Sequence, residues 1–215
     1  MRIFKNVYNK INVFIRPTGK VNKHYNNYVL WSSVSNTIAS IEGVLSTHSM
    51  LSVIGNTSNE LTLSVNYIGK DIAGQLGGLW YINKIGKRVD TQSTKITHIN
   101  LILQETSIFL ECLTPFLPIY TFIPVAGIAN VGKNISFTGL GAINARIIQK
   151  LAEEDNIGEI YSKITILNTL GSSIGMGLGL VLTGLIPDHS TRLCLMPILS
   201  VLRIYSYKQS IKYLL

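Results

Sequence analysis

Residues 164–187 read ITILNTLGSSIGMGLGLVLTGLIP, and this charge-free stretch decides the fold class. A helix needs about 20 apolar residues to cross the roughly 30 Å hydrocarbon core of a bilayer. Gly171, Gly175 and Gly179 recur every fourth position, so a helix places them on one face. In lipid such a stripe lets another helix approach closely, whereas each glycine costs a soluble helix about 1 kcal/mol. We therefore predict helix-packing roles for these glycines in a membrane-spanning helix, with a buried helix of a soluble core as the alternative.

The composition of the whole chain also favours a membrane protein. Only 14% of its 215 residues are charged, against about 25% in soluble domains, and the mean hydropathy is +0.31. The net charge is +8, and no acidic residue precedes Glu42. Such a basic start suits anionic lipid head groups. We expect a membrane location, an organelle membrane included, with lipid as a partner and no nucleic-acid partner, because no nucleic-acid-binding motif is present.

Apolar residues recur at helical spacing throughout the chain, which predicts an all-α fold. We expect a helical bundle, membrane-embedded, with glycine-rich and tightly packed helices. The chain divides into a basic N-terminal arm (1–23), a helical core (24–190) and a basic amphipathic C-terminal helix (191–215). Within the core we expect helices at 22–55, 61–85, 94–113 and 134–151, and a polar connection at 84–95.

Residues 112–132 form a second charge-free stretch of sufficient length to span a membrane. Pro115, Pro118 and Pro124 fall within it, and proline kinks or breaks a helix. The stretch is therefore either a kinked span or a re-entrant segment.

Motifs of catalysis and metal binding are not found in the sequence. The Gly-x-Gly pairs do not follow a predicted strand, as a dinucleotide site requires. The four histidines are scattered, without carboxylates at the spacing of zinc ligands. We predict no catalytic residue, no metal site and no enzymatic activity, and we name no cofactor.

The stretch IGKDIAGQLGG, residues 68–78, carries the strongest candidate binding residues. Ionisable groups within a membrane helix are costly and usually face a cavity or a partner. Lys70 could neutralise an anion that Asp71 balances, and Gly74 and Gly78 would expose the backbone to it. The alternative is an anchor at the membrane boundary, with Lys70 reaching the head groups.

Several separated positions together resemble the root UVB-sensitive (RUS) family, also labelled vitamin B6 photoprotection and homeostasis. The resemblance covers about residues 17–184. Its positions are Pro17, Val21, Tyr25, Tyr28 and Trp31; Lys70, Asp71, Gly74 and Gly77; Lys95, Glu111 and Pro115; and Asn156, Lys163, Asn168, Gly171 and Gly175.

Three positions depart from the family pattern. Ile72 stands where the family has glycine, Ile102 where it has aspartate, and Glu159 where it has aspartate. If these polar groups form a site in the family, this chain has an altered one.

The resemblance implies a membrane-associated protein linked to vitamin B6 homeostasis, without an established reaction. We therefore expect this chain to bind or move a small anionic metabolite, with Asn156 and Lys163 joining Lys70, Asp71, Gly74 and Gly78 as candidate ligand-binding residues. The alternative is a non-enzymatic helical interaction or scaffold protein. It would act through the glycine stripe on a partner, either a second copy or a related family member.

Overall fold

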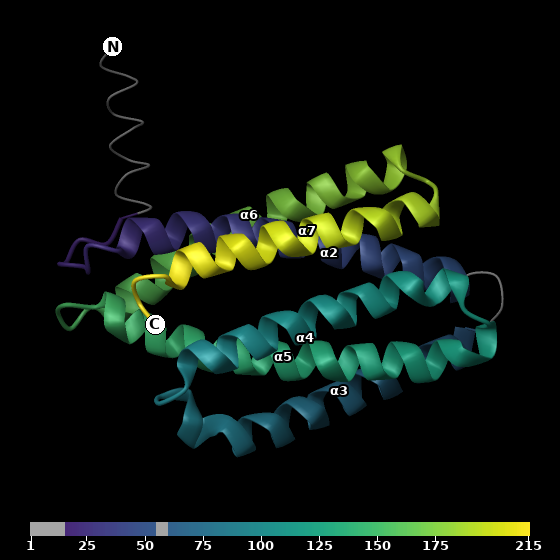
Figure 1. Cartoon of the computed structure of the whole chain (residues 1–215), viewed down its shortest axis with the longest axis horizontal. Coiled ribbons are helices and arrows are strands. Elements are labelled where there is room, and N and C mark those ends of the chain that lie inside the picture. Colours follow the sequence, from purple (N-terminus) through teal and green to yellow (C-terminus); the bar gives the residue numbers. More distant parts are fainter. Residues whose placement is uncertain (1–15, 55–59) are drawn as a thin grey trace, which may run out of the picture.

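The computed structural model describes residues 16–54 and 60–215, and this part of the chain folds into six α-helices (Figure 1). The predicted all-α class is confirmed. Two short 3-10 turns, η1 and η2, separate the third and fourth of these helices. The elements are α2 (Tyr25–Ile54), α3 (Glu60–Val89), α4 (Ser93–Leu113), η1 (Thr114–Phe116), η2 (Ile119–Thr121), α5 (Phe122–Leu151), α6 (Ile157–Leu185) and α7 (His189–Ile211).

The helices form two groups of three (Figure 1). In one group α5 packs against both α3 and α4, and in the other α2 packs against both α6 and α7. Contacts of α4 with α2 and α7 join the groups. The two central helices, α2 and α5, run in opposite directions. Helix α2 begins beside the end of α5, where the backbone N–H of Asn22 donates to the carbonyl of Leu151 (3.0 Å).

The proline-rich stretch breaks the helix as predicted, but the next helix begins earlier than expected. Pro115 lies in η1 and Pro118 precedes η2, so the chain is not a continuous helix there. Pro124 lies in the first turn of α5. Backbone N–H groups in this turn have no hydrogen-bond acceptor within the helix, so proline is tolerated there. Helix α5 therefore begins at Phe122 rather than Asn134, and residues 112–132 are not a spanning helix. Within residues 16–54 and 60–215, only α6 is long and apolar enough to cross a membrane.

The polar connection predicted at 84–95 is shorter in the structure, because α3 continues to Val89 and α4 begins at Ser93. Residues 1–15 of the predicted N-terminal arm lie outside the described residues. The predicted C-terminal helix corresponds to α7, whose Met196 is buried in a cluster with Ile41 of α2 and Ile108 of α4. This helix therefore shares a core with residues 24–190.

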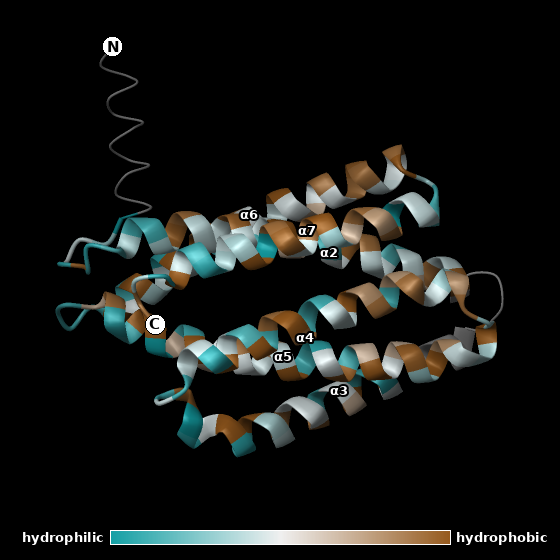
Figure 2. Cartoon of the chain, viewed as in Figure 1, coloured by the Kyte–Doolittle hydropathy of each residue, from teal (hydrophilic) through white to brown (hydrophobic). Residues whose placement is uncertain are grey.

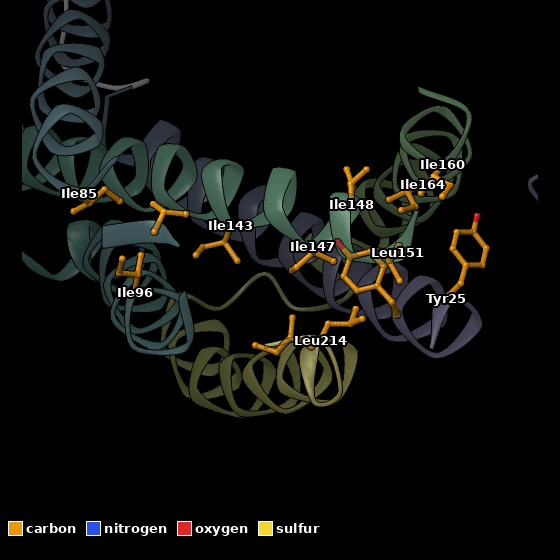
Figure 3. Packing of buried hydrophobic residues seen from close by; sticks show 13 residues of the cluster. Tyr25, Ile85, Ile96, Ile143, Ile147, Ile148, Leu151, Ile160, Ile164 and Leu214 are labelled. Atoms are coloured by element: carbon orange, nitrogen blue, oxygen red, sulfur yellow. The ribbon is translucent and has the colours of Figure 1, made fainter. Parts of the chain in front are cut away.

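A row of apolar side chains along α5 forms the main core (Figure 3). Ile143, Ile147 and Leu151 are fully buried there. Residues of α3, α4, α6 and the C-terminal end surround them: Ile85, Ile96, Ile160, Ile164 and Leu214.

Many large apolar side chains are exposed on the outer surface of the bundle, and several charged or polar side chains are buried within it. Helix α6 is the most apolar element (Figure 2) and exposes large side chains at helical spacing. A soluble amphipathic helix shows the reverse pattern, with its apolar stripe turned inward. The exposed residues include Leu170, Ile174, Leu178, Val181 and Leu185 on α6 and Ile68, Ile72, Leu76 and Leu79 on α3, whereas Glu42, Asn100, Glu105, Glu111, Arg192 and Arg203 are buried.

Candidate functional site

A cavity of about 760 Å³ lies between α2, α5 and α6, and side chains of α4 and α7 also line it. This volume is within the roughly 300–1,000 Å³ of small-molecule sites. Helix α2 lines it with four short polar residues at helical spacing, so one face of the helix is turned to the cavity. The polar groups available for hydrogen bonding include Ser32, Ser35, Asn36 and Ser40 of α2, Asn144 of α5 and Asn168 of α6.

Two hydrogen bonds link the walls of this cavity. The hydroxyl of Tyr28 donates to Oδ1 of Asn144 (2.6 Å), which joins α2 to α5. The hydroxyl of Ser33 approaches Oδ1 of Asn168 (3.5 Å), which joins α2 to α6. These bonds hold the two amide side chains at fixed positions in the wall, where they can present hydrogen-bonding groups to a ligand.

Arg203 of α7 is the cationic group of the cavity wall. Its NH1 donates to Oε1 of Glu105 (2.6 Å) and lies 3.5 Å from Oε2 of Glu42. Ser200 donates to the other oxygen of Glu42 (3.2 Å). All three charged residues are at most 6% exposed. Since unpaired charge is costly to bury, the guanidinium makes it possible to bury both carboxylates.

The guanidinium also retains unused hydrogen-bonding capacity. Nε of Arg203 is buried and has no hydrogen-bond partner within the described part of the chain. An arginine N–H makes its strongest hydrogen bonds with carboxylates and phosphates. Because Nε is itself inaccessible to solvent, an anion in the cavity could bond to it only after the wall around Arg203 opens.

The candidate residues on α3 form a helix contact instead of lining this cavity. Nζ of Lys70 lies 3.2 Å from Oδ1 of Asp71. The side-chain amide of Asn130 on α5 donates to the carbonyl of Lys70 (2.8 Å) and to Oδ1 of Asp71 (3.3 Å). Gly74 and Gly78 are buried in the same seam, where a Cβ on Gly74 would collide with the Asn130 side chain.

The two candidate residues on the later helix lie elsewhere. Asn156 precedes α6, and its side-chain amide donates to the carbonyl of Lys20 (2.9 Å). Lys163 follows in the second turn of α6. Helices α3 and α6 lie on opposite sides of the bundle (Figure 1), so the six predicted residues do not form one site. None of them lines the cavity described above.

The glycine stripe of α6 packs against α2 of the same chain. A Cβ on Gly171 would stand 3.0 Å from the carbonyl oxygen of Ser33, and one on Gly179 would stand 2.8 Å from Cβ of Val44. Gly175 meets the backbone of α2 still more closely. The stripe is thus covered inside the molecule, which removes it as the contact face of the interaction-protein alternative.

The comparison with known families identifies the chain. The vitamin B6 photo-protection and homoeostasis domain matches residues 4–214. The chain belongs to the root UVB-sensitive family. It is similar to the protein root UVB sensitive 4 of Arabidopsis thaliana, at 30% identity over 204 residues that cover 91% of this chain and 39% of that protein.

Relatives outside plants share the RUS family resemblance. RUS family member 1 of Dictyostelium discoideum is 24% identical over 190 residues, which cover 86% of this chain and 36% of that protein. The chain thus spans less than two-fifths of the length of these two relatives. No solved structure matches it. Tyr28 and Asn168, two of the positions on which the RUS resemblance rests, both line the cavity.

Proposed function

We propose that this RUS family protein is a membrane-embedded, non-enzymatic protein that binds and moves a small anionic metabolite. The cavity beside Arg203 is its binding site. One observation carries the proposal: a cavity with several hydrogen-bonding side chains in its wall lies between the helices of a bundle that exposes rows of large apolar side chains.

The distribution of polarity supports a lipid environment. In hydrocarbon every polar group needs an internal partner, whereas apolar side chains are stable at the surface. Two buried carboxylates follow this pattern, since Glu111 pairs with Lys133 (2.5 Å) and Glu105 with Arg203 (2.6 Å). The exposed rows of α3 and α6 would face lipid, which is the partner we propose for them. Isolated apolar residues are normal on soluble proteins, but long rows of them are not.

Arg203 and the family description together suggest the class of ligand. Arg203, the cationic residue of the cavity wall, suits a phosphate or carboxylate, and the serine and asparagine side chains suit a polar ring. The domain description names vitamin B6. Pyridoxal 5′-phosphate, which combines a polar ring with a phosphate, is therefore the first probe we choose.

The first experiment measures membrane partition and ligand binding in sequence. Membranes containing the protein are washed with alkaline carbonate, and we expect release only by detergent. Purified protein is then titrated with pyridoxal 5′-phosphate and, separately, with inorganic phosphate. Release by carbonate alone would overturn membrane embedding, and saturable binding of neither probe would overturn the proposed site for phosphate-bearing anions.

A matched pair of variants on α6 tests the location of the site. Asn168→Leu introduces an apolar side chain into the cavity wall, whereas Ser173→Leu changes an exposed position on the same helix outside the cavity. We expect Asn168→Leu to weaken probe binding at least tenfold and Ser173→Leu to leave it within twofold. Equal effects of the two variants would place the binding elsewhere.

A further inference from the structure

The two halves of the chain have matching helices at a nearly constant separation in sequence. Helices α2 and α5 begin at positions 25 and 122, an offset of 97. Helices α3 and α6 end at 89 and 185, which are 96 apart. Helices α4 and α7 begin at 93 and 189, also 96 apart. Their first turns contain the similar triplets Ser93-Thr94-Lys95 and Ser190-Thr191-Arg192.

The contacts between the halves repeat at the same offset, with the roles of the halves exchanged. Asn130 of α5 contacts Asp71 of α3. The residues 97 positions away, Ser33 of α2 and Asn168 of α6, also contact each other. Each half therefore places its second helix on the first helix of the other half.

The glycines of the two seams correspond as well. A Cβ on Gly78 would approach the carbonyl oxygen of Asn134 (3.3 Å). At the corresponding positions, a Cβ on Gly175 would overlap the carbonyl oxygen of Thr37. Side-chain contacts, backbone contacts and helix bounds in the two halves are thus all related by an offset of about 97 positions.

The relation between the halves is an inversion. Because α2 and α5 are antiparallel, the axis that exchanges the halves lies across the helices rather than along them. Inverted repeats of this kind underlie many secondary transporters, which bind solute at the repeat interface and open alternately to the two sides. Here α2, α6 and α7 correspond to α5, α3 and α4, and the cavity lies between these two groups.

The cavity itself is not symmetric. It extends toward the end of the bundle where α2 begins, because Tyr28, Ile148 and Ile157 line it. Ser32 lines it too, whereas Ala129, the residue 97 positions later, is fully buried. Asn36 lines the cavity, and its counterpart Lys133 pairs with Glu111.

We propose that the bundle is an inverted-repeat carrier with two alternately accessible cavities. The cavity seen here opens toward one end of the bundle. Its counterpart, lined by Asp71, Asn130 and Lys133, opens toward the opposite end. This inference rests on the proposed solute binding and assigns a role to the Lys70–Asp71 segment. The two seams hold α6 on α2 and α3 on α5, so the two groups rock against each other as bodies.

Thiol labelling from the two sides of sealed vesicles tests this. The background carries Cys112→Ala and Cys194→Ala, since both native thiols are free. A membrane-impermeant maleimide is then applied from each side to Ser32→Cys and, separately, to Ala129→Cys. We expect labelling of the first from one side and of the second from the opposite side. Labelling of both from the same side, or of Ala129→Cys from neither side, would overturn the inference.

A second pair guards against a variant that fails to fold. Ala39→Cys, which lines the cavity, and Ser136→Cys, 97 positions later and fully buried, are small replacements at another matched pair of positions, and we expect the same opposite sidedness. Binding of pyridoxal 5′-phosphate to the unmodified protein is measured separately in detergent. Failure of that binding overturns the proposed solute, whereas the labelling pattern alone decides whether access alternates.

Discussion

Two glycines on one helix turn should respond to alanine in opposite directions. A Cβ on Gly175 would overlap the carbonyl oxygen of Thr37 and lie 2.9 Å from Cβ of Ser40. The obstructing atom is backbone, so α6 would have to move away from α2. A Cβ on Gly177 has no atom within 4 Å. The first site is therefore sterically closed to alanine, and the second is open to it.

The magnitudes follow from two opposing terms. Overpacking costs about 1–3 kcal/mol, and a clash with backbone belongs at the upper end, about 3 kcal/mol. Replacing glycine by alanine within a helix returns about 1 kcal/mol. We expect Gly175→Ala to lower the free energy of unfolding by about 2 kcal/mol and Gly177→Ala to raise it by about 1 kcal/mol. For a chain of this length, each kcal/mol shifts Tm by about 2–4 °C.

The assay is thermal unfolding of the purified variants, in detergent where the protein requires it. Gly78→Ala provides a comparison in the other seam. The nearest atom to its Cβ would be Oγ1 of Thr138 (2.8 Å), which can rotate away, so a smaller loss is expected. If Gly175→Ala and Gly177→Ala shift Tm in the same direction by similar amounts, the tight α2–α6 contact is wrong.

The remaining predictions concern charged groups. Glu111→Gln leaves Lys133 without its buried counter-charge and should cost about 3 kcal/mol, the lower end for a broken buried pair because Lys133 is partly exposed. Chemical denaturation should show that adding Lys133→Met to Glu111→Gln recovers most of this loss, and an additive loss would contradict it. Arg203→Met strands two buried carboxylates, so it should destabilise the protein more than Glu111→Gln and abolish binding of inorganic phosphate by titration calorimetry. The side-chain hydroxyl and the backbone N–H of Thr191 donate to the carboxylate of Asp188 and hold the pKa of Asp188 below the usual value of 3.8. The ionised carboxylate therefore stabilises the fold at neutral pH, and this stabilisation is lost as the pH falls below the usual pKa and through the lowered one. A Tm–pH profile should be flatter in Asp188→Asn, and identical acid slopes would refute this.

The sequence was sufficient to predict most helices, because helix periodicity and turn residues are local signals. The break at Pro115 and Pro118 was also a local signal, although its consequence for the start of α5 was not. The cavity escaped prediction because serine and asparagine on one face of α2 are common in any helix. The Arg203–Glu105 pair joins residues 98 positions apart, and nothing near either residue indicates the other.

The six predicted ligand-binding residues combined two different places in the fold. Lys70 and Asp71 belong to the α3–α5 seam, whereas Asn156 and Lys163 belong to the start of α6. A comparison of the sequence with itself could have separated them. Shifted by 97 positions, Gly74 falls on Gly171 and Gly78 falls on Gly175, so the amino-acid sequence alone indicates that the two helices correspond.

The exchange of second helices between the halves also governs how the protein is made. During synthesis α2 emerges first, but the helix that covers its small-residue face, α6, begins more than a hundred residues later. Helix α3 likewise lacks its main packing partner until α5 has been synthesised. The first three helices therefore leave the ribosome without the partners that complete them, and the native arrangement becomes available only after most of the second half has been synthesised.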